Sequence, residues 1–316
     1  MHSTHIGLGP GREFDLVRRM LARWGELAHG VGDDAAILDV PAGERVVVST
    51  DASVEGVHFR REWLSLREFG YRASAAALSD LAAMAATPRG MVVALTLPEA
   101  SMEEVEALAD GIGDAARQTG TPIVGGDITR GRQLAVAITV IGSAAVPARR
   151  DAVAAGDIIY VTGVLGGPSA ALRALERGEV PEPALRERFA RPRPRLAEAV
   201  WLAQHGVRAL IDISDGLASE LRHLAVASGL ELRVDADRIP VMRGCTFSDA
   251  THGGEEYELV VAAPQPLDAD AFARTFALPL SEIGRARRAE VPGVVASRAG
   301  SGERVDLGVG HDHFSS

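Results

Sequence analysis

The sequence predicts an α+β protein of two domains, and three observations support this class. The chain has 316 residues, more than the ~250–300 at which a single hydrophobic core usually stops growing. Hydrophobic residues make up 47% of the chain, enough to fill two cores. Strand and helix patterns are mixed along the whole length, without the strict alternation of a doubly wound parallel sheet. We therefore expect one domain over residues 1–148 and a second over residues 149–316.

The first half contains both helical and strand patterns. Ser101 and Glu104 have the spacing of a capping box, which predicts the start of a helix. An alanine-rich stretch favours another helix, and Pro88 ends it. The predicted helices cover residues 12–28, 67–86 and 101–118, and the predicted strands cover 35–38, 45–49, 91–97, 123–124 and 134–141.

The second half begins after a polar stretch of small residues at 146–155. Apolar runs bounded by glycine and acidic residues indicate strands, and longer periodic segments indicate helices. The predicted strands cover residues 157–162, 210–213, 230–234, 259–263 and 283–286, and the predicted helices cover 168–177, a segment ending near 205, and 214–227.

Composition narrows the class of protein. The net charge of −10 disfavours nucleic acid as a partner, because that binding depends on clustered positive charge. The single cysteine, Cys245, excludes an internal disulfide and suits a reducing cytosol. The sequence has neither an apolar run of about 18 residues nor the layout of a secretory signal, so we expect a cytoplasmic protein without a membrane span.

Short acidic motifs next to glycine or small hydroxyl residues are spread along the chain. Each has a simple explanation by itself, since Gly and Asp form turns and Ser214 or Asp215 could cap a helix. Asp80 is different, because it lies between Leu78 and Leu81 in an alanine-rich helix. The motifs are Gly32-Asp33-Asp34, Ser49-Thr50-Asp51, Ser79-Asp80, Gly125-Gly126-Asp127, Asp212-Ile213-Ser214-Asp215 and Gly253-Gly254-Glu255-Glu256.

The chain contains no lysine, so the lysine-dependent P-loop pattern is absent. If the acids converge, their mutual repulsion would be costly unless metal ions neutralised it. Magnesium is the natural occupant, because it prefers hard oxygen ligands and bridges carboxylates to phosphate oxygens. The acids therefore favour a magnesium-dependent nucleotide site.

Taken in order, these segments resemble the thiamine-monophosphate kinase family, within the superfamily that includes aminoimidazole ribonucleotide synthetase. The resemblance covers essentially the whole chain. Besides the acidic motifs it rests on Val54-Glu55-Gly56-Val57-His58-Phe59, Leu78-Ser79-Asp80-Leu81-Ala82-Ala83-Met84, Thr129-Arg130-Gly131, Gly156-Asp157-Ile158-Ile159-Tyr160-Val161-Thr162-Gly163, Tyr257-Glu258-Leu259 and Asp312-His313-Phe314.

The resemblance implies the superfamily's two α+β domains, a homodimer and an acidic cleft that binds ATP. It implies an enzyme that moves the γ-phosphoryl group of ATP directly onto thiamine monophosphate, giving thiamine diphosphate and ADP, with several magnesium ions. The implied metal ligands are Asp34, Ser49, Thr50, Asp51, Asp80, Asp127, Asp212 and Asp215. Asp80, Asp127 and Asp215 would be catalytic, Gly126, Arg150 and Ser214 would contact ATP, and His58 and Glu255 would contact the thiamine phosphate.

The chain also departs from the family pattern. Ala77 replaces an asparagine, Ala85 a glycine, and Gly308 an aromatic residue that can stack on thiamine. Glu220 and Glu256 replace aspartates, and the turn at residues 166–169 carries one residue more. Two alternatives stay open, namely a related enzyme that acts on another phosphorylated small molecule and a non-catalytic nucleotide-binding protein. Cys245 lies at neither position where selenophosphate synthetase or the hydrogenase-maturation dehydratase needs cysteine.

Overall fold

The computed structural model describes residues 10–99 and 101–308. The chain divides into two compact units, of which the first contains the residues up to Leu81 together with Ala86–Ala145. The second contains Ala82–Ala85 and the chain from Val146 onward. Both units mix helices with sheet, so the predicted α+β class is confirmed. The domain ranges 1–148 and 149–316 stay a prediction.

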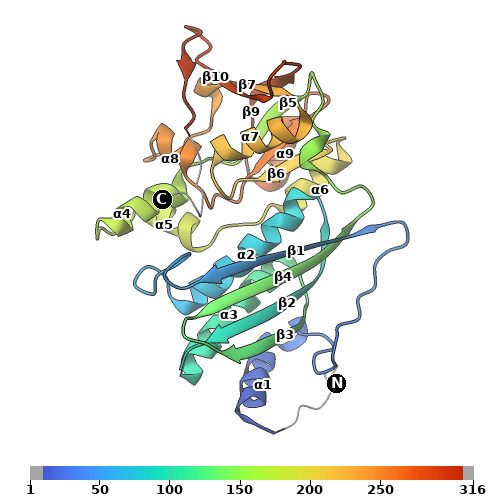
Figure 1. The fold of residues 1–316 in the computed structure, drawn as a ribbon, viewed down its shortest axis with the longest axis vertical. Coiled ribbons are helices and arrows are strands. Elements are labelled where there is room, and N and C mark those ends of the chain that lie inside the picture. Colours follow the sequence, from blue (N-terminus) through green and yellow to red (C-terminus); the bar gives the residue numbers. More distant parts are fainter. Residues whose placement is uncertain (1–9, 100, 309–316) are drawn as a thin grey trace. The chain divides into compact units, whose positions relative to one another are not determined.

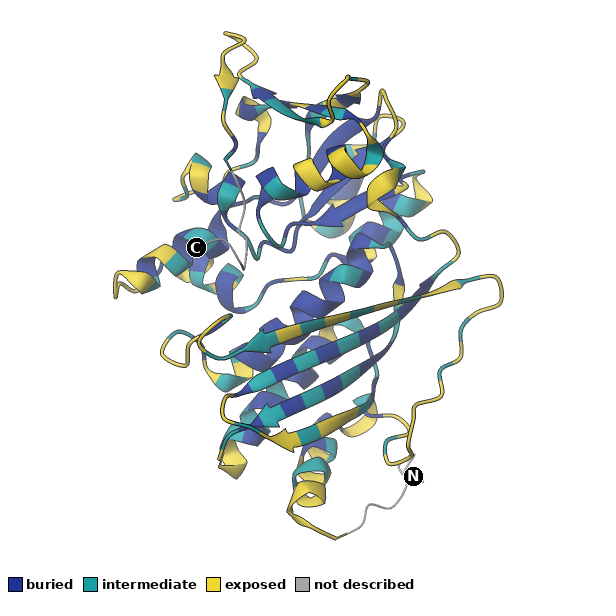
Figure 2. Cartoon of the chain, in the orientation of Figure 1, coloured by how far each residue is buried: buried dark blue, intermediate teal, exposed yellow. Residues whose placement is uncertain are grey.

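The first unit contains a sheet that, among the described residues, has four strands in the order β1-β4-β2-β3 (Figure 1). Strand β2 runs parallel to β3, and the other two pairs are antiparallel. Side chains alternate between the two faces, and the strands are accordingly banded in burial (Figure 2). The strands are β1 (Arg45–Val54), β2 (Thr87–Leu97), β3 (Ile123–Arg130) and β4 (Ala135–Ala144).

Two long helices, α2 (Leu66–Ala83) and α3 (Met102–Thr119), cover the buried face of this sheet. They approach closely because glycine lies at the crossing: a Cβ on Gly111 would come within 1.9 Å of the Arg67 carbonyl oxygen. The helix α1 (Arg12–Trp24) is fastened to α3 by Trp24, whose indole N–H donates to the Ala109 carbonyl at 2.9 Å. The predicted capping box is confirmed, since Ser101 and Glu104 each accept the other's backbone N–H.

Several local predictions for this unit differ from the structure. The helix predicted over 12–28 ends at Trp24, and the strand predicted at 123–124 continues to Arg130 through the predicted glycine turn. Residues 35–38 do not form a strand, and Ile37 is 94% exposed. Strand β1 is longer than predicted and continues to Val54, because all of its residues pair with β4. The consequence for function is that Thr50 and Asp51 lie within a strand and so point to opposite faces of the sheet.

The second unit is built on a larger sheet, which in the described part of the chain has the strand order β11-β10-β7-β9-β5-β8-β6 (Figure 1). Strands β7 and β10 pair in parallel, and the other neighbours are antiparallel. The strands are β5 (Ile158–Thr162), β6 (Ala209–Asp212), β7 (Glu231–Asp235), β8 (Leu259–Ala263), β9 (Leu280–Arg287), β10 (Gly293–Ser297) and β11 (Arg304–Val305).

The helix α7 shares the main hydrophobic core of this unit with the sheet. Its Leu217, Leu221 and Leu224 are fully buried against strand residues such as Ile211 and Val260. The helices of this unit are α4 (Gly167–Glu176), α5 (Pro183–Ala190), α6 (Leu196–Gln204), α7 (Leu217–Ser228), α8 (Phe247–His252) and α9 (Ala269–Phe276), with short 3₁₀ turns η2 (Arg150–Ala152) and η3 (Ala236–Arg238); η1 (Gly25–Leu27) belongs to the first unit. Among the described residues no helix combines the length and the apolar character that a membrane span requires.

Candidate functional site

The first group of predicted ligands lies where β1 meets α2. Ser49 Oγ donates a hydrogen bond of 2.5 Å to Asp80 Oδ2. Asp51 follows two residues after Ser49, so its side chain is on the same face of the strand. Leu78 and Leu81, which flank Asp80, are completely buried. The structure therefore brings one hydroxyl and two carboxylate groups to the helix-covered face of the sheet.

Thr50 and Asp127 lie on the opposite face. Thr50 Oγ1 is 2.8 Å from Thr139 Oγ1 on β4. Asp127 is in register with Ala94 of β2, and through Ala137 with Ala52 of β1. Residues in register share a face, and Ala52 shares a face with Thr50. The two faces of the sheet thus separate these predicted ligands into two sets.

The remaining predicted residues of this unit lie in turns or at a close strand approach. Asp34 is exposed, and its backbone N–H donates to Asp33 Oδ1 at 2.9 Å. A Cβ on Gly126 would come within 2.1 Å of the Val93 carbonyl oxygen, so only glycine allows β3 to pair with β2 there. His58 Nδ1 accepts the Val54 N–H at 3.1 Å, which places the ring proton of the neutral imidazole on Nε2.

The second group of acids surrounds the turn between β6 and α7. Asp212 is the last residue of β6 and is buried. Ser214 and Asp215 do not cap α7, because Gly216 is its N-cap residue and no side chain caps it. The helix-cap interpretation of these two residues is therefore wrong.

Glu220 on α7 completes this second group, and the sequence alone did not identify it as a site residue. Its Oε1 accepts the Asp215 N–H at 3.1 Å and lies 3.5 Å from Ser214 Oγ. Burial, together with the negative charges of Asp212 and Asp215, raises the pKa of Glu220 to about 7. One signal in the sequence could have identified Glu220: it lies three residues after Leu217, and this spacing places both residues on the same, core-facing side of α7.

Arg150 lies beside this group in η2. The Ser228 hydroxyl donates to the Arg150 carbonyl at 3.0 Å, which fixes the backbone there. The positive charge of Arg150 favours the ionised form of the carboxyl group of Glu220. It opposes protonation of His223, whose pKa is lowered first by burial and then by Arg150. The second unit thus places the positive charge of Arg150 near the carboxyl group of Glu220.

The turn that carries Glu255 has an unusual backbone. Glu255 and Tyr257 have φ angles of +63° and +52°, the left-handed region that favours glycine. The Glu255 N–H donates to the Ser214 carbonyl at 2.7 Å. A Cβ on Gly254 would come within 2.4 Å of the same oxygen. The structure thus brings together the turns that carry Ser214 and Glu255.

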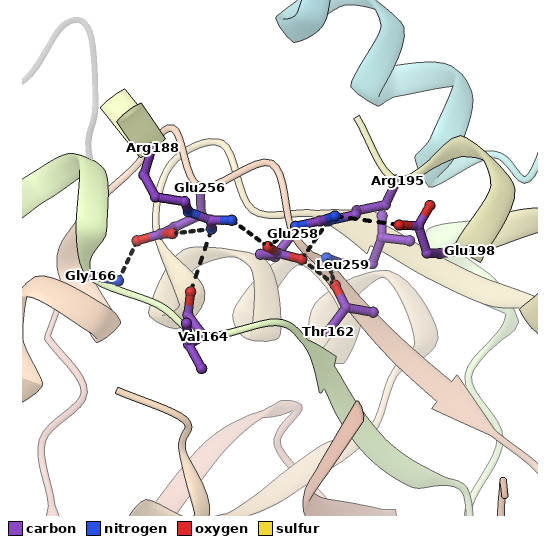
Figure 3. Close-up of polar contacts among 9 residues, drawn as sticks. All are labelled: Thr162, Val164, Gly166, Arg188, Arg195, Glu198, Glu256, Glu258 and Leu259. Carbon is purple, nitrogen blue, oxygen red and sulfur yellow. Dashed lines mark hydrogen bonds and ion pairs between the residues drawn. The ribbon is translucent and has the colours of Figure 1, made fainter. Parts of the chain in front are cut away.

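A buried network of charges lies directly after Glu255 (Figure 3). The side chains of Glu256 and Glu258 have no exposed surface. Arg188 of α5 contacts Glu256 at 3.1 Å and Glu258 at 2.7 Å, and Arg195 contacts Glu258 at 2.5 Å. Burial favours the neutral acid, yet the guanidinium groups of Arg195 and Arg188 lower the pKa of Glu258. For Glu256 burial prevails and raises the pKa to about 7, although Arg188 and the Gly166 N–H oppose it.

Gly308, which replaces the family's aromatic residue, lies against α8. It has a φ angle of +77°, and a Cβ there would lie 1.5 Å from His252 Nε2. Arg222 Nη2 donates to the Gly308 carbonyl at 3.0 Å. His252 therefore fills the space in which a side chain at 308 would begin. The motif Asp312-His313-Phe314 lies outside the described residues.

The oxygen chemistry of both acid groups fits a hard divalent cation such as Mg²⁺. The repulsion that Glu220 experiences from Asp212 and Asp215 is what such a cation would relieve. Within residues 10–99 and 101–308, no group of three or more His, Cys, Asp or Glu side chains is arranged to hold a metal ion.

Comparison with known proteins identifies the class. Residues 32–144 match the AIR synthase related protein, N-terminal domain, and residues 154–296 match the C-terminal domain of the same proteins. This pair of domains agrees with the predicted superfamily. The structure is similar to a HypE hydrogenase maturation protein in complex with ATP, with a TM-score of 0.79 at 22% identity, which shows a common fold.

The individual relatives define the family more narrowly. The chain is 35% identical to the thiamine-monophosphate kinase of Salmonella typhimurium, over 96% of either chain. It is similar to the crystal structure of thiamine-monophosphate kinase from Stenotrophomonas maltophilia, with a TM-score of 0.81 and 36% identity over 93% of this chain and 98% of that one. A ThiL protein complexed with AMPPCP and TMP matches with a TM-score of 0.76 and 28% identity, over 95% of this chain and 96% of that one. The chain belongs to the thiamine-monophosphate kinase family.

Proposed function

We propose that the protein transfers the γ-phosphoryl group of ATP to thiamine monophosphate, forming thiamine diphosphate and ADP. The acid group of Asp212, Asp215 and Glu220 carries this proposal, because a divalent cation bound there would relieve the repulsion among these carboxylates and bind the phosphates of ATP. A relative bound to AMPPCP and TMP supports both the nucleotide and the acceptor.

The chemistry of each side chain determines its role in the proposed reaction. Mg²⁺ would be held by Asp34, Ser49, Thr50, Asp51, Asp80, Asp127, Asp212 and Asp215, and it would supply neutralisation of the phosphate charges for direct in-line transfer. Ser49 orients Asp80 through their hydrogen bond, and Asp80, Asp127 and Asp215 are the catalytic acids of this set. Gly126, Arg150 and Ser214 contact ATP. His58 and Glu255 position the acceptor, and the His58 ring is held to the β1 strand by the Val54 N–H.

The first experiment measures ADP release from Mg-ATP by the purified protein, with and without thiamine monophosphate, and identifies the product by chromatography. We expect release that depends on the acceptor, together with thiamine diphosphate. Release stimulated only by another phosphorylated acceptor would reject the substrate. Tight nucleotide binding without turnover would instead support a non-catalytic nucleotide-binding protein.

A second experiment tests the role of Asp80. The variant Asp80→Asn keeps the shape of the side chain but removes its charge, so we expect kcat to fall by about 100-fold or more while the protein stays folded. Asp110→Asn on α3 is the matched control, since Asp110 contacts Arg23 and belongs to no predicted site. Near-normal turnover of Asp80→Asn would exclude Asp80 as a metal ligand.

A related enzyme acting on another acceptor is the second candidate. Gly308 favours it, because His252 fills the space of the aromatic side chain expected there. A panel of phosphorylated acceptors, compared by kcat/KM, separates the two candidates.

We also propose that the protein is a cytoplasmic homodimer that pairs through the outer face of the β1-β4-β2-β3 sheet. Val46 and Val48 on this face are 56% and 60% exposed, although both are apolar residues of β1. Light scattering of the eluted protein tests the dimer, and Val48→Glu should weaken it.

A further inference from the structure

We propose that Arg188 is a positioning residue for the acceptor site, acting through Glu256 on the turn that carries Glu255. This inference rests on the proposed function, in which Glu255 contacts the acceptor. Arg188 belongs to α5, an element that contributes no predicted site residue, so neither a motif nor the resemblance pointed to it.

The turn needs an external support. Glu255 and Tyr257 both hold φ angles in the left-handed region, and such conformations persist only where surrounding structure fixes them. Backbone bonds fix one side: Glu255 N–H donates to Ser214 at 2.7 Å and Tyr257 N–H donates to Ile213 at 3.0 Å. The other side must be fixed by side chains.

Glu256 and Glu258 provide that second attachment. They alternate with the two strained residues and point into the protein, with no exposed side-chain surface. Glu256 accepts the Gly166 N–H at 2.5 Å, and Glu258 accepts the Thr162 hydroxyl at 2.7 Å. The turn is therefore fastened to the end of β5 and to the start of α4.

Arg188 connects the two carboxylates (Figure 3). One guanidinium nitrogen lies 2.7 Å from Glu258 and the other lies 3.1 Å from Glu256, and the second also donates to the Val164 carbonyl at 3.4 Å. Arg195, by contrast, contacts Glu258 and the nearby Glu198. Loss of Arg188 would remove the guanidinium group that joins Glu256 to Glu258 and to the Val164 carbonyl, so the turn would lose this attachment.

The test compares Arg188→Met with Arg177→Met, because Arg177 forms an exposed pair with Glu179 in the same unit. We expect Arg188→Met to raise KM for thiamine monophosphate by about tenfold while KM for ATP changes by less than about twofold. Amide hydrogen exchange of residues 254–257 should accelerate in Arg188→Met and stay unchanged in Arg177→Met. Equal increases in both KM values, or unchanged exchange, would overturn the proposal.

Two further variants keep the test decisive if Arg188→Met folds poorly. Arg188→Lys retains a cation but cannot reach both carboxylates in the same geometry, so we expect an intermediate KM for the acceptor. The double variant Arg188→Met with Glu256→Gln removes one charge of each sign and should recover thermal stability without recovering this KM. A wild-type KM in either variant contradicts the positioning role.

The exchange measurement also separates this proposal from the proposed function. If the wild-type protein phosphorylates a different acceptor, the proposed function fails, and the exchange of residues 254–257 in Arg188→Met still decides whether Arg188 holds the turn.

Discussion

Ala85 lies two residues after the end of α2 and has a φ angle of +50°, although it is not a glycine. The left-handed conformation costs an L-residue roughly 1–2 kcal/mol, because its Cβ approaches the following carbonyl oxygen. Glycine has no Cβ and avoids this cost. The thiamine-monophosphate kinase family usually has glycine at this position, and the left-handed backbone conformation explains why glycine is favoured there. We therefore expect Ala85→Gly to relieve strain.

The magnitude follows from a comparison with Ala76→Gly in the interior of α2. Ala85 and Ala76 are 7% and 6% exposed, so each variant loses one buried methyl group, worth about 0.8 kcal/mol. In each variant the free energy of unfolding also falls by about 0.5–1 kcal/mol, because glycine gives the unfolded chain more conformational freedom. These two losses are common to both variants. We therefore expect Ala85→Gly to be about 1–2 kcal/mol more stable than Ala76→Gly.

Urea unfolding of both variants and the wild type, followed by tryptophan fluorescence and circular dichroism, measures this difference. The expected order of unfolding midpoints is Ala85→Gly close to wild type and Ala76→Gly clearly lower. Equal losses in the two variants would refute the reasoning, because they would mean that Ala85 carries no backbone strain.

Three other predictions concern single side chains. Because burial raises the pKa of Glu220 from 4.5 to about 7, the metal-free folded state becomes less stable by up to about 3 kcal/mol as the pH rises from about 4.5 through 7. Urea unfolding in EDTA should show the full loss in wild type and in the exposed control Glu176→Gln, and a smaller loss in Glu220→Gln, where the contribution of Glu256 remains; an equal loss in all three would contradict the shift. Burial also raises the pKa of the Cys245 thiol from 9.0 to about 11. Because only the thiolate reacts, iodoacetamide at about pH 8 should alkylate Cys245 about 100-fold more slowly in the native protein than in the unfolded chain. Equal rates would contradict the shift. Ser101→Ala removes the cap of α3 and should cost about 1 kcal/mol of unfolding free energy, whereas an unchanged urea midpoint would mean that the cap contributes nothing.

Local chemistry made much of the fold predictable from the sequence. The capping box at Ser101 specifies its own hydrogen bonds, so the start of α3 was predicted within one residue. The segment at 35–38 has a strand-like composition, yet it pairs with no neighbouring strand, and composition cannot provide a partner. Strand β1 extends to Val54 for the opposite reason, since pairing with β4 continues past the apolar residues.

The site was predictable where motifs mark it and missed where burial alone defines it. The sequence indicated Asp80 as a site residue because it lies between Leu78 and Leu81, and the structure shows that it accepts a hydrogen bond from Ser49. Glu256 and Glu258 belong to a run of acids that resembles a solvated surface, although both are buried. Their partner Arg188 lies about 70 residues earlier in the chain, and sequence patterns of period 2 or 3.6 cannot identify so distant a pair.

The close approach of His252 to Gly308 makes these two positions depend on each other in evolution. An aromatic residue at 308 requires the space that the His252 ring now occupies, and a backbone at +77° resists any side chain. A relative with an aromatic residue at 308 must therefore carry a shorter or differently oriented side chain at 252. The two positions are expected to change together among related chains. An aromatic residue could therefore be introduced at position 308 of this protein only if His252 were replaced as well.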